Sequence, residues 1–136
     1  MTKIKATNKE MLETLHGLYA VQDLKGVKFA VAVSKNIEKL RNELKHIDEA
    51  SKPSPEFEKL LQEADKIEKS EESEKLIKKL EKENKELIDK RKAQLEEVND
   101  ILEETVELDL VTMSEKNLPQ DITAKQLSAI IKIVNN

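Results

Sequence analysis

The sequence contains no cysteine, which excludes disulfides, thiol chemistry and every zinc site that needs a thiolate ligand. Glycine occurs only at Gly17 and Gly26, so no glycine-rich loop can hold a phosphate group. Aromatic residues make up 2% of the chain and tryptophan is absent. Because aromatic side chains usually line ligand pockets, we expect no deep small-molecule site and no cofactor.

Long apolar runs are also missing. No stretch approaches the ~18 apolar residues of a membrane-spanning helix. The first residues, Met1–Lys5, lack the apolar core of a signal peptide, so we expect a cytoplasmic protein. The formal net charge is −4, and the only arginines are Arg41 and Arg91. Both facts argue against a surface that binds nucleic acid, which needs cations and favours arginine.

What the chain has in excess is charge. Charged residues make up 38% of the sequence, as many as the hydrophobic residues, whereas an average domain has about 25% charged residues. This balance predicts long helices with narrow apolar stripes rather than a large core. The length of 136 residues predicts a single domain over residues 1–136.

Apolar spacing predicts helices along most of the chain. Thr7 and Glu10 form a capping box that begins the first helix, which should end near Gly26. The second helix, over about 27–50, has apolar residues at alternating steps of three and four, which is a heptad seam. These residues are Ala30, Val33, Ile37, Leu40, Leu44 and Ile47. Two prolines then break the helix over residues 51–55, and Ser54 can cap the next one.

The apolar stripe of the third helix covers residues 57–67 and resumes over 76–102, where Asn84 and Arg91 interrupt it. Residues 68–75 between the two stretches contain no apolar side chain. They are either an exposed continuation of the helix or a loop at the tip of a hairpin. The seams can pack within one molecule or between two copies of the chain.

A strand pattern follows the last long helix. Val106, Leu108 and Leu110 alternate with acidic residues. A lone strand cannot satisfy its backbone groups, so we predict that it pairs with the strand-like residues 2–6. Near the end, Thr123 and Gln126 form a second capping box. It begins a short helix with the apolar residues Leu127, Ile130, Ile131 and Val134.

These elements predict a mostly α fold. It is a long, coiled-coil-like helical hairpin or small bundle, with a minor two-stranded β ribbon near the termini. Such a fold buries its apolar stripes between helices and leaves no cavity for a reactant.

The two histidines are the candidates for chemistry. His16 follows Glu13 by one helical turn, and a carboxylate–histidine pair can transfer protons. No nucleophile is expected near it, however. His46 is flanked by charged helix residues, and neither histidine has the i,i+4 histidine spacing of a metal site. We therefore predict no catalytic residue, no metal site and no enzymatic activity.

Candidate interaction residues come from the acidic stretch over 96–109 and from the rare aromatics. Glu96, Asp100, Glu103 and Glu104 could bind a basic protein surface or imitate a phosphate backbone. Tyr19 and Phe29 are the aromatic candidates. The lysine-rich residues 74–92 carry interleaved glutamates and are interpreted as a solvated helix face.

Two segments resemble a known family. Residues 8–40 contain G-L-Y-A-V-Q-D-L-K-G-V-K-F-A, and residues 118–130 begin L-P-Q-D-I-T-A-K-Q-L. Together they resemble a family of small bacteriophage proteins of unknown function. The resemblance covers about a third of the chain and implies a viral protein in the host cytoplasm. It carries over no catalytic residue.

From these observations we expect a non-enzymatic protein–protein interaction module that presents helix faces to a host or viral protein. It would be a phage-encoded inhibitor or modulator of a host protein complex. One alternative is an accessory protein of virion assembly, and another is an acidic mimic of nucleic acid. A second copy of the chain could bind through the heptad seams.

Overall fold

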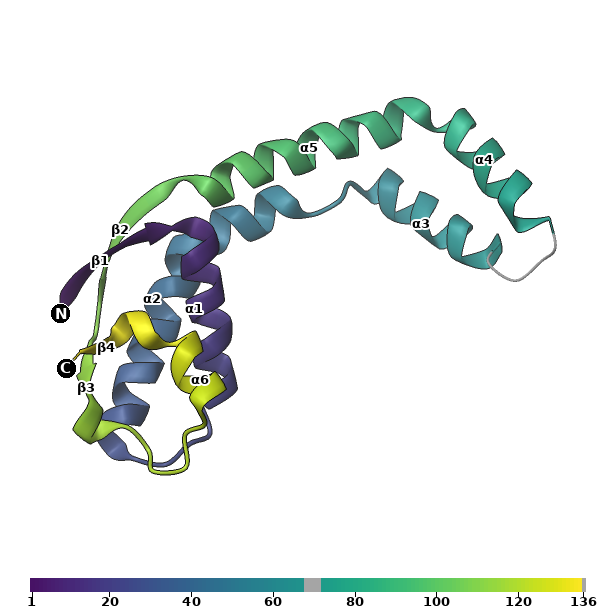
Figure 1. The fold of residues 1–136 in the computed structure, drawn as a ribbon. Coiled ribbons are helices and arrows are strands. Elements are labelled where there is room, and N and C mark those ends of the chain that lie inside the picture. The colour runs from purple at the N-terminus through teal and green to yellow at the C-terminus, as the bar shows by residue number, and fades with distance from the viewer. Residues whose placement is uncertain (68–71, 136) are drawn as a thin grey trace. The chain divides into compact units, whose positions relative to one another are not determined.

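The computed structural model describes residues 1–67 and 72–135, and helices make up 72% of them, which confirms the mostly α prediction. The elements follow one another as β1 (Thr2–Thr7), α1 (Asn8–Val21), α2 (Val27–Ser51), α3 (Pro55–Ile67), α4 (Ser73–Glu83), α5 (Lys85–Glu103), β2 (Thr105–Leu110), β3 (Met113–Ser114), the 3-10 turn η1 (Glu115–Asn117), α6 (Ala124–Ala129), the 3-10 turn η2 (Ile131–Ile133) and β4 (Val134–Asn135) (Figure 1). In the segment predicted as helix or loop, residues 73–75 belong to α4, and residues 68–71 lie outside the described residues.

The chain divides into two compact units. Unit 1 comprises residues 1–46 and 101–136, and unit 2 comprises residues 47–100. This division does not test whether residues 1–136 form a single domain, so the single domain stays a prediction.

The predicted β ribbon is confirmed in unit 1. β1 and β2 pair antiparallel from Thr2↔Leu110 to Thr7↔Thr105. Apolar residues face one another on the inner side, where Ala6, Leu108 and Leu110 are buried. The register also places Lys3 opposite Asp109 and Lys5 opposite Glu107, and such opposite-charge pairs contribute roughly 0.2–1 kcal/mol each.

α1 begins directly where β1 ends. Thr7 Oγ1 accepts a hydrogen bond from the Glu10 backbone N–H, and the Thr7 backbone N–H donates to the Glu10 carboxylate, which confirms the capping box. The end of the helix differs from the prediction. α1 ends at Val21, and Gly26 lies before α2, where its carbonyl accepts from the Ala30 N–H. Its φ of 132° explains why glycine stands there.

α2 buries a wider face than the predicted seam. Val33, Leu40, Leu44 and Ile47 are buried as expected, but Ala30 is exposed and Ile37 is half-buried. Phe29, Ala32 and Asn36 are buried in addition. An apolar face this wide is typical of a helix in a globular core, whereas a two-helix seam is narrower.

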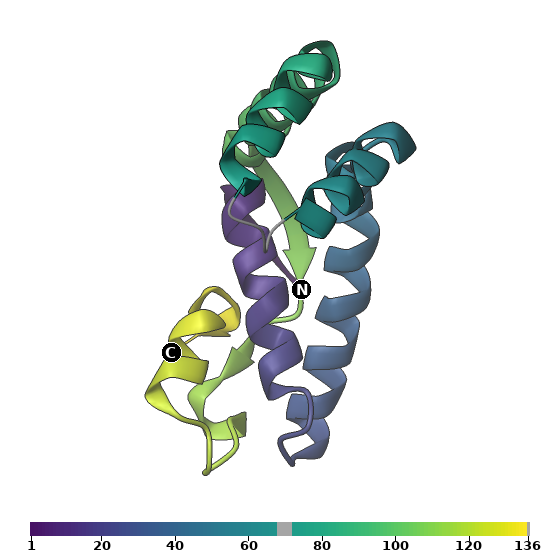
Figure 2. The ribbon, with the colours of Figure 1, turned by 90° about the vertical axis from the view of Figure 1, so that its right-hand side faces the viewer.

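The core of unit 1 surrounds α1, which lies between α2 and α6 (Figure 2). Its buried residues recur at helical spacing as Met11, Leu15, Leu18 and Val21. α6 approaches α1 closely at Gly17. A Cβ atom added to Gly17 would lie 2.8 Å from the Ala129 Cβ and 3.0 Å from the Ala129 carbonyl oxygen. Only a residue without a side chain permits this approach.

The C-terminal helix is shorter than predicted. The capping box of Thr123 and Gln126 is confirmed, but α6 ends at Ala129 instead of continuing through Val134. The chain then makes the turn η2, which buries Ile130 and Ile133 completely. Val134 and Asn135 pair parallel with Met113 and Ser114. The turn buries two isoleucines and still leaves the last residues extended for this pairing, which a continued helix would prevent.

In unit 2, α2 ends at Ser51 and α3 begins at Pro55, with Ser54 Oγ accepting from the Phe57 N–H at 3.2 Å. The helix expected over 76–104 is divided into α4 and α5 at Asn84. The Asn84 side-chain amide donates to the Leu80 carbonyl at 2.9 Å. This local bond competes with the helical pattern and ends α4.

The second polar interruption, Arg91, caps the end of α2. Arg91 donates to the Ser51 carbonyl at 2.8 Å, and Gln94 donates to the carbonyls of Ala50 and Lys52 at 2.7 and 2.8 Å. The last carbonyls of a helix have no partner within it, so these two side chains supply the missing donors. Few buried apolar side chains stabilise the packing of the helices in unit 2. In the described part of unit 2, the buried ones are Ile47, Leu60 and Val98.

The contact at Gly17 gives a first prediction. Gly17→Ala should gain about 0.5–1 kcal/mol of helix propensity and lose about 1–3 kcal/mol through overpacking against Ala129. We expect the free energy of unfolding to fall by about 1–2 kcal/mol, measured by urea denaturation. Adding Ala129→Gly should recover part of this loss, because it removes the nearest atom. A stabilised Gly17→Ala variant would contradict the close approach of α6.

Candidate interaction surface

The residues considered for chemistry lie at the surface. His16 and His46 are both exposed. Within residues 1–67 and 72–135, no three histidine or acidic side chains gather closely enough to hold a metal ion. In the same residues, every buried polar side-chain atom has a hydrogen-bond partner.

The predicted interaction residues fall into two groups. Glu96, Asp100, Glu103 and Glu104 are exposed, and Tyr19 is 37% exposed. Phe29 is 1% exposed, because it lies on the buried face of α2. Its aromatic ring is part of the core of unit 1, so Phe29 is corrected from an interaction candidate to a core residue.

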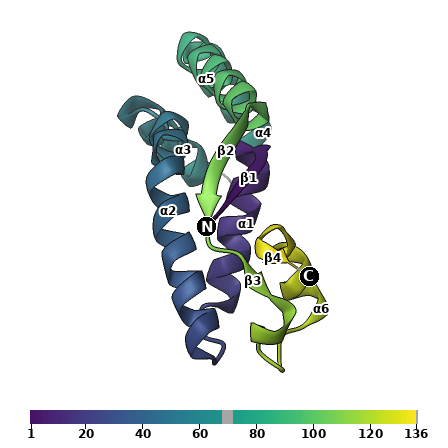
Figure 3. The same cartoon turned by 90° about the vertical axis from the view of Figure 1, so that its left-hand side faces the viewer.

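A surface that the sequence did not single out lies in unit 1. A groove of about 380 Å³ runs between the first half of α2 and the segment around β3, which lie beside one another in Figure 3. We call it the α2 groove. Its helix side is formed by Val27, Lys28, Val31, Ala32 and Lys35, and its other side by residues 111–114, Asn117 and Asn135.

Two valines make the helix side of the α2 groove apolar. Val27 is 83% exposed and Val31 is 48% exposed, one turn apart on α2. Neither valine belongs to the heptad seam predicted for this helix. The neighbouring Phe29, Ala32 and Val33 are buried in the core of unit 1. Val27 and Val31 therefore lie at the surface.

The opposite side of the groove is held by Asn36, which is 1% exposed. Its side-chain amide donates to the Val111 carbonyl at 2.8 Å, and its side-chain oxygen accepts from the Val111 N–H at 2.7 Å. Asn36 thus pairs with the backbone of Val111 as a neighbouring strand would. The next residue, Thr112, shares hydrogen bonds of 3.1 Å with the side chains of Thr2 and Asn135.

The α2 groove is positively charged in an acidic protein. Lys28 and Lys35 line it, and in the described part of the chain no carboxylate does. Among the described residues, neither lysine takes part in an ion pair. Lys35 lies seven positions after Lys28, a distance of about 10.5 Å along the helix, and Val31 lies between the two lysines. The groove therefore presents cation, apolar side chain and cation in that order.

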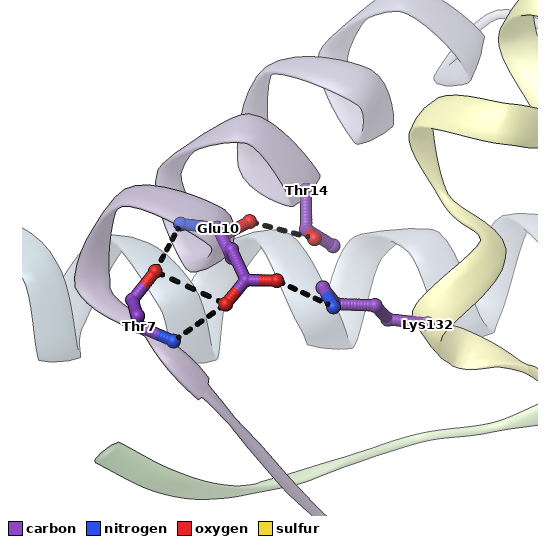
Figure 4. Close-up of polar contacts among 4 residues, drawn as sticks. All are labelled: Thr7, Glu10, Thr14 and Lys132. Carbon is purple, nitrogen blue, oxygen red and sulfur yellow. Dashed lines mark hydrogen bonds and ion pairs between the residues drawn. The ribbon is translucent and has the colours of Figure 1, made fainter. Parts of the chain in front are cut away.

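A second polar feature joins the start of α1 to η2 (Figure 4). Glu10 accepts hydrogen bonds from the Thr7 backbone N–H at 3.0 Å and from the Thr7 hydroxyl at 3.1 Å, and it forms an ion pair of 3.0 Å with Lys132. The Thr7 N–H, followed by Lys132, lowers the pKa of Glu10 from 4.5 to about 2. Each partner favours the charged carboxylate, so Glu10 is a structural anion here.

Comparison with family models, with curated proteins and with solved structures gives no match. The resemblance to small bacteriophage proteins therefore stays a prediction. None of the helices in the described residues combines the length and the hydropathy needed to cross a membrane.

Asn36 gives the second prediction. Asn36→Ala removes both partners of Val111, and each buried group without a partner costs about 1–3 kcal/mol. We expect the free energy of unfolding to fall by about 2–4 kcal/mol in urea denaturation. Asn99→Ala is the matched control, because Asn99 is an exposed asparagine within α5. Equal effects of the two substitutions would show that the bonds to Val111 do not stabilise the fold.

Glu10 gives the third prediction. Because the pKa of Glu10 is lower in the folded state, its charge stabilises the fold above about pH 4.5, and this contribution is lost as the pH falls to about 2. Glu10→Gln keeps a capping box, as Gln126 does in α6, and removes only the charge. Urea denaturation should show wild type more stable than Glu10→Gln at pH 7, with the difference closing by pH 2. Glu13→Gln, on the same helix, is the control for loss of an exposed charge. A difference that does not change with pH would contradict the role of the carboxylate.

Proposed function

We propose that the protein is a non-enzymatic protein–protein interaction module whose α2 groove contacts the partner. The observation that carries the proposal is the exposure of Val27 and Val31 beside a groove that the hydrogen bonds of the buried Asn36 hold in place. Burying apolar surface against a partner contributes roughly 25 cal/mol per Å². Apolar surface that a fold leaves exposed is typical of an interaction site when it is contiguous and rimmed by polar residues.

The biological role that we propose for this module is based on the resemblance to bacteriophage proteins. We propose a phage-encoded modulator of a host protein complex that acts in the host cytoplasm. Accessory function in virion assembly remains the alternative.

We also propose that α3, α4 and α5 act as a coiled-coil-like hairpin. In this reading Leu61, Leu76 and Leu95, which are 41–47% exposed, offer an apolar stripe to a second copy of the chain.

A second candidate is supported by the exposed carboxylates Glu96 and Asp100 on α5, with Glu103 at its end. These residues are spaced four and three apart, so they follow one side of the helix. In that case the chain would imitate a phosphate backbone and bind a basic protein surface. Binding of this kind weakens as salt is added, because surface charges are screened.

The proposal is tested by capture with the purified chain, followed by binding measurements on the captured protein. Val31→Asp places a charge in the α2 groove, and we expect it to weaken binding at least tenfold in isothermal titration calorimetry, because the carboxylate would be desolvated against the partner. Ile131→Asp is the matched control, since Ile131 is 54% exposed and Val31 48%, and Ile131 does not line the α2 groove. Circular dichroism should show that both variants are folded.

Two outcomes would contradict a role for the α2 groove. One is binding that Val31→Asp leaves unchanged. The other is loss of binding in the triple variant Glu96→Gln, Asp100→Asn and Glu103→Gln, combined with a strong salt dependence, which would favour the acidic mimic.

A further inference from the structure

We propose that the α2 groove binds an extended acidic segment of the partner protein, with an apolar side chain between two carboxylates. This inference rests on the proposed function, because it names the partner chemistry for the same groove. It is carried by the charge and shape of the groove, which limit what can occupy it.

The first argument is charge complementarity. The protein has a net charge of −4, yet the groove is lined by two lysines and no carboxylate. A segment with carboxylates would be attracted to Lys28 and Lys35, whereas the protein as a whole carries a net negative charge. Complementary charges of this kind mainly set specificity and the rate of association.

The second argument is the order of side chains along α2. Lys28, Val31 and Lys35 span about 10.5 Å of helix. In an extended chain every second side chain points to the same face, and four residues span roughly 13 Å. Acidic, apolar and acidic residues at alternate positions would therefore match lysine, valine and lysine, with the length of the lysine side chains absorbing the difference.

The third argument is the free edge of β3. Met113 and Ser114 pair with β4 along one edge, and in the described part of the chain no strand pairs along the other. Extended peptides commonly bind by adding a strand to such an edge. This favours an extended segment over a helical one.

The same observations disfavour nucleic acid in the groove. Two lysines neutralise few phosphates, and nucleic-acid affinity depends on the number of phosphates neutralised. The exposed side chains of Val27 and Val31 also have neither a hydrogen-bond donor nor a positive charge to bind a phosphate. A protein segment satisfies both the apolar and the charged residues.

The experiment uses the full chain and a fluorescent peptide with the sequence Thr-Glu-Thr-Val-Thr-Glu-Thr, blocked at both ends. Fluorescence anisotropy should show saturable binding that weakens as salt is added. Replacing both Glu residues of the peptide by Gln should weaken binding at least tenfold, and so should replacing its Val by Ser. In the protein, Lys28→Glu with Lys35→Glu should weaken binding at least tenfold. Lys75→Glu with Lys82→Glu is the control, since these exposed lysines have the same spacing on α4.

Several results would overturn the inference. Equal affinity for the Gln peptide would mean that charge is not recognised. Displacement of the peptide by a single-stranded oligonucleotide would indicate a nucleic-acid site. Concentration-dependent dimers that Lys28→Glu with Lys35→Glu abolishes would make a second copy the occupant.

Failure here is distinguishable from failure of the proposed function. If Val31→Asp abolishes partner binding while Lys28→Glu with Lys35→Glu leaves it unchanged, the groove is an interface but the acidic segment is wrong. If Val31→Asp leaves partner binding unchanged, the groove itself is wrong.

Discussion

Asn36 is the residue on which the shape of unit 1 depends most. It satisfies both backbone groups of Val111 at the point where the chain leaves β2, and it does so from a buried position on α2. A buried backbone group without a partner costs about as much as a lost hydrogen bond. The chain after β2 is therefore tied to α2, and β3 follows two residues later in position to receive β4. The α2 groove exists because this tie holds its two sides together.

The parts of the fold that could be predicted are those with local causes. Each capping box needs only two residues three apart, and both were found from the sequence at Thr7 and Thr123. The pairing of β1 with β2 followed from elimination, since a strand needs a partner and one other segment alternated. The break after Ser51 follows from proline geometry, which acts on the preceding residue alone.

The parts that could not be predicted depend on distant residues. β3 and β4 have two residues each, too few to show any alternation. Nothing in the sequence around Asn36 reveals that its hydrogen-bond partner is Val111, 75 residues further along the chain. The candidate surface was missed for the same reason. Val27 and Val31 lie outside the predicted seam, and only the burial of Phe29, Ala32 and Val33 shows which face of α2 the core covers and which it leaves exposed. Arg91 likewise interrupts a stripe for a reason found 40 residues away, at the end of α2.

The one clear electrostatic perturbation in the described residues has a structural cause. Strongly perturbed pKa values cluster at catalytic sites, because catalysis needs groups held away from their ordinary protonation. In the described residues the clear perturbation is at Glu10, and its causes are a helix cap and an ion pair. Both stabilise the carboxylate and neither prepares it to accept a proton at neutral pH, since a pKa of about 2 makes a weak base. Glu10, the one strongly shifted acid among the described residues, thus joins α1 to η2. The exposed Val27 and Val31 and the two lysines of the α2 groove have no comparable structural role in the described residues, and this is why we propose them as the surface that contacts a partner.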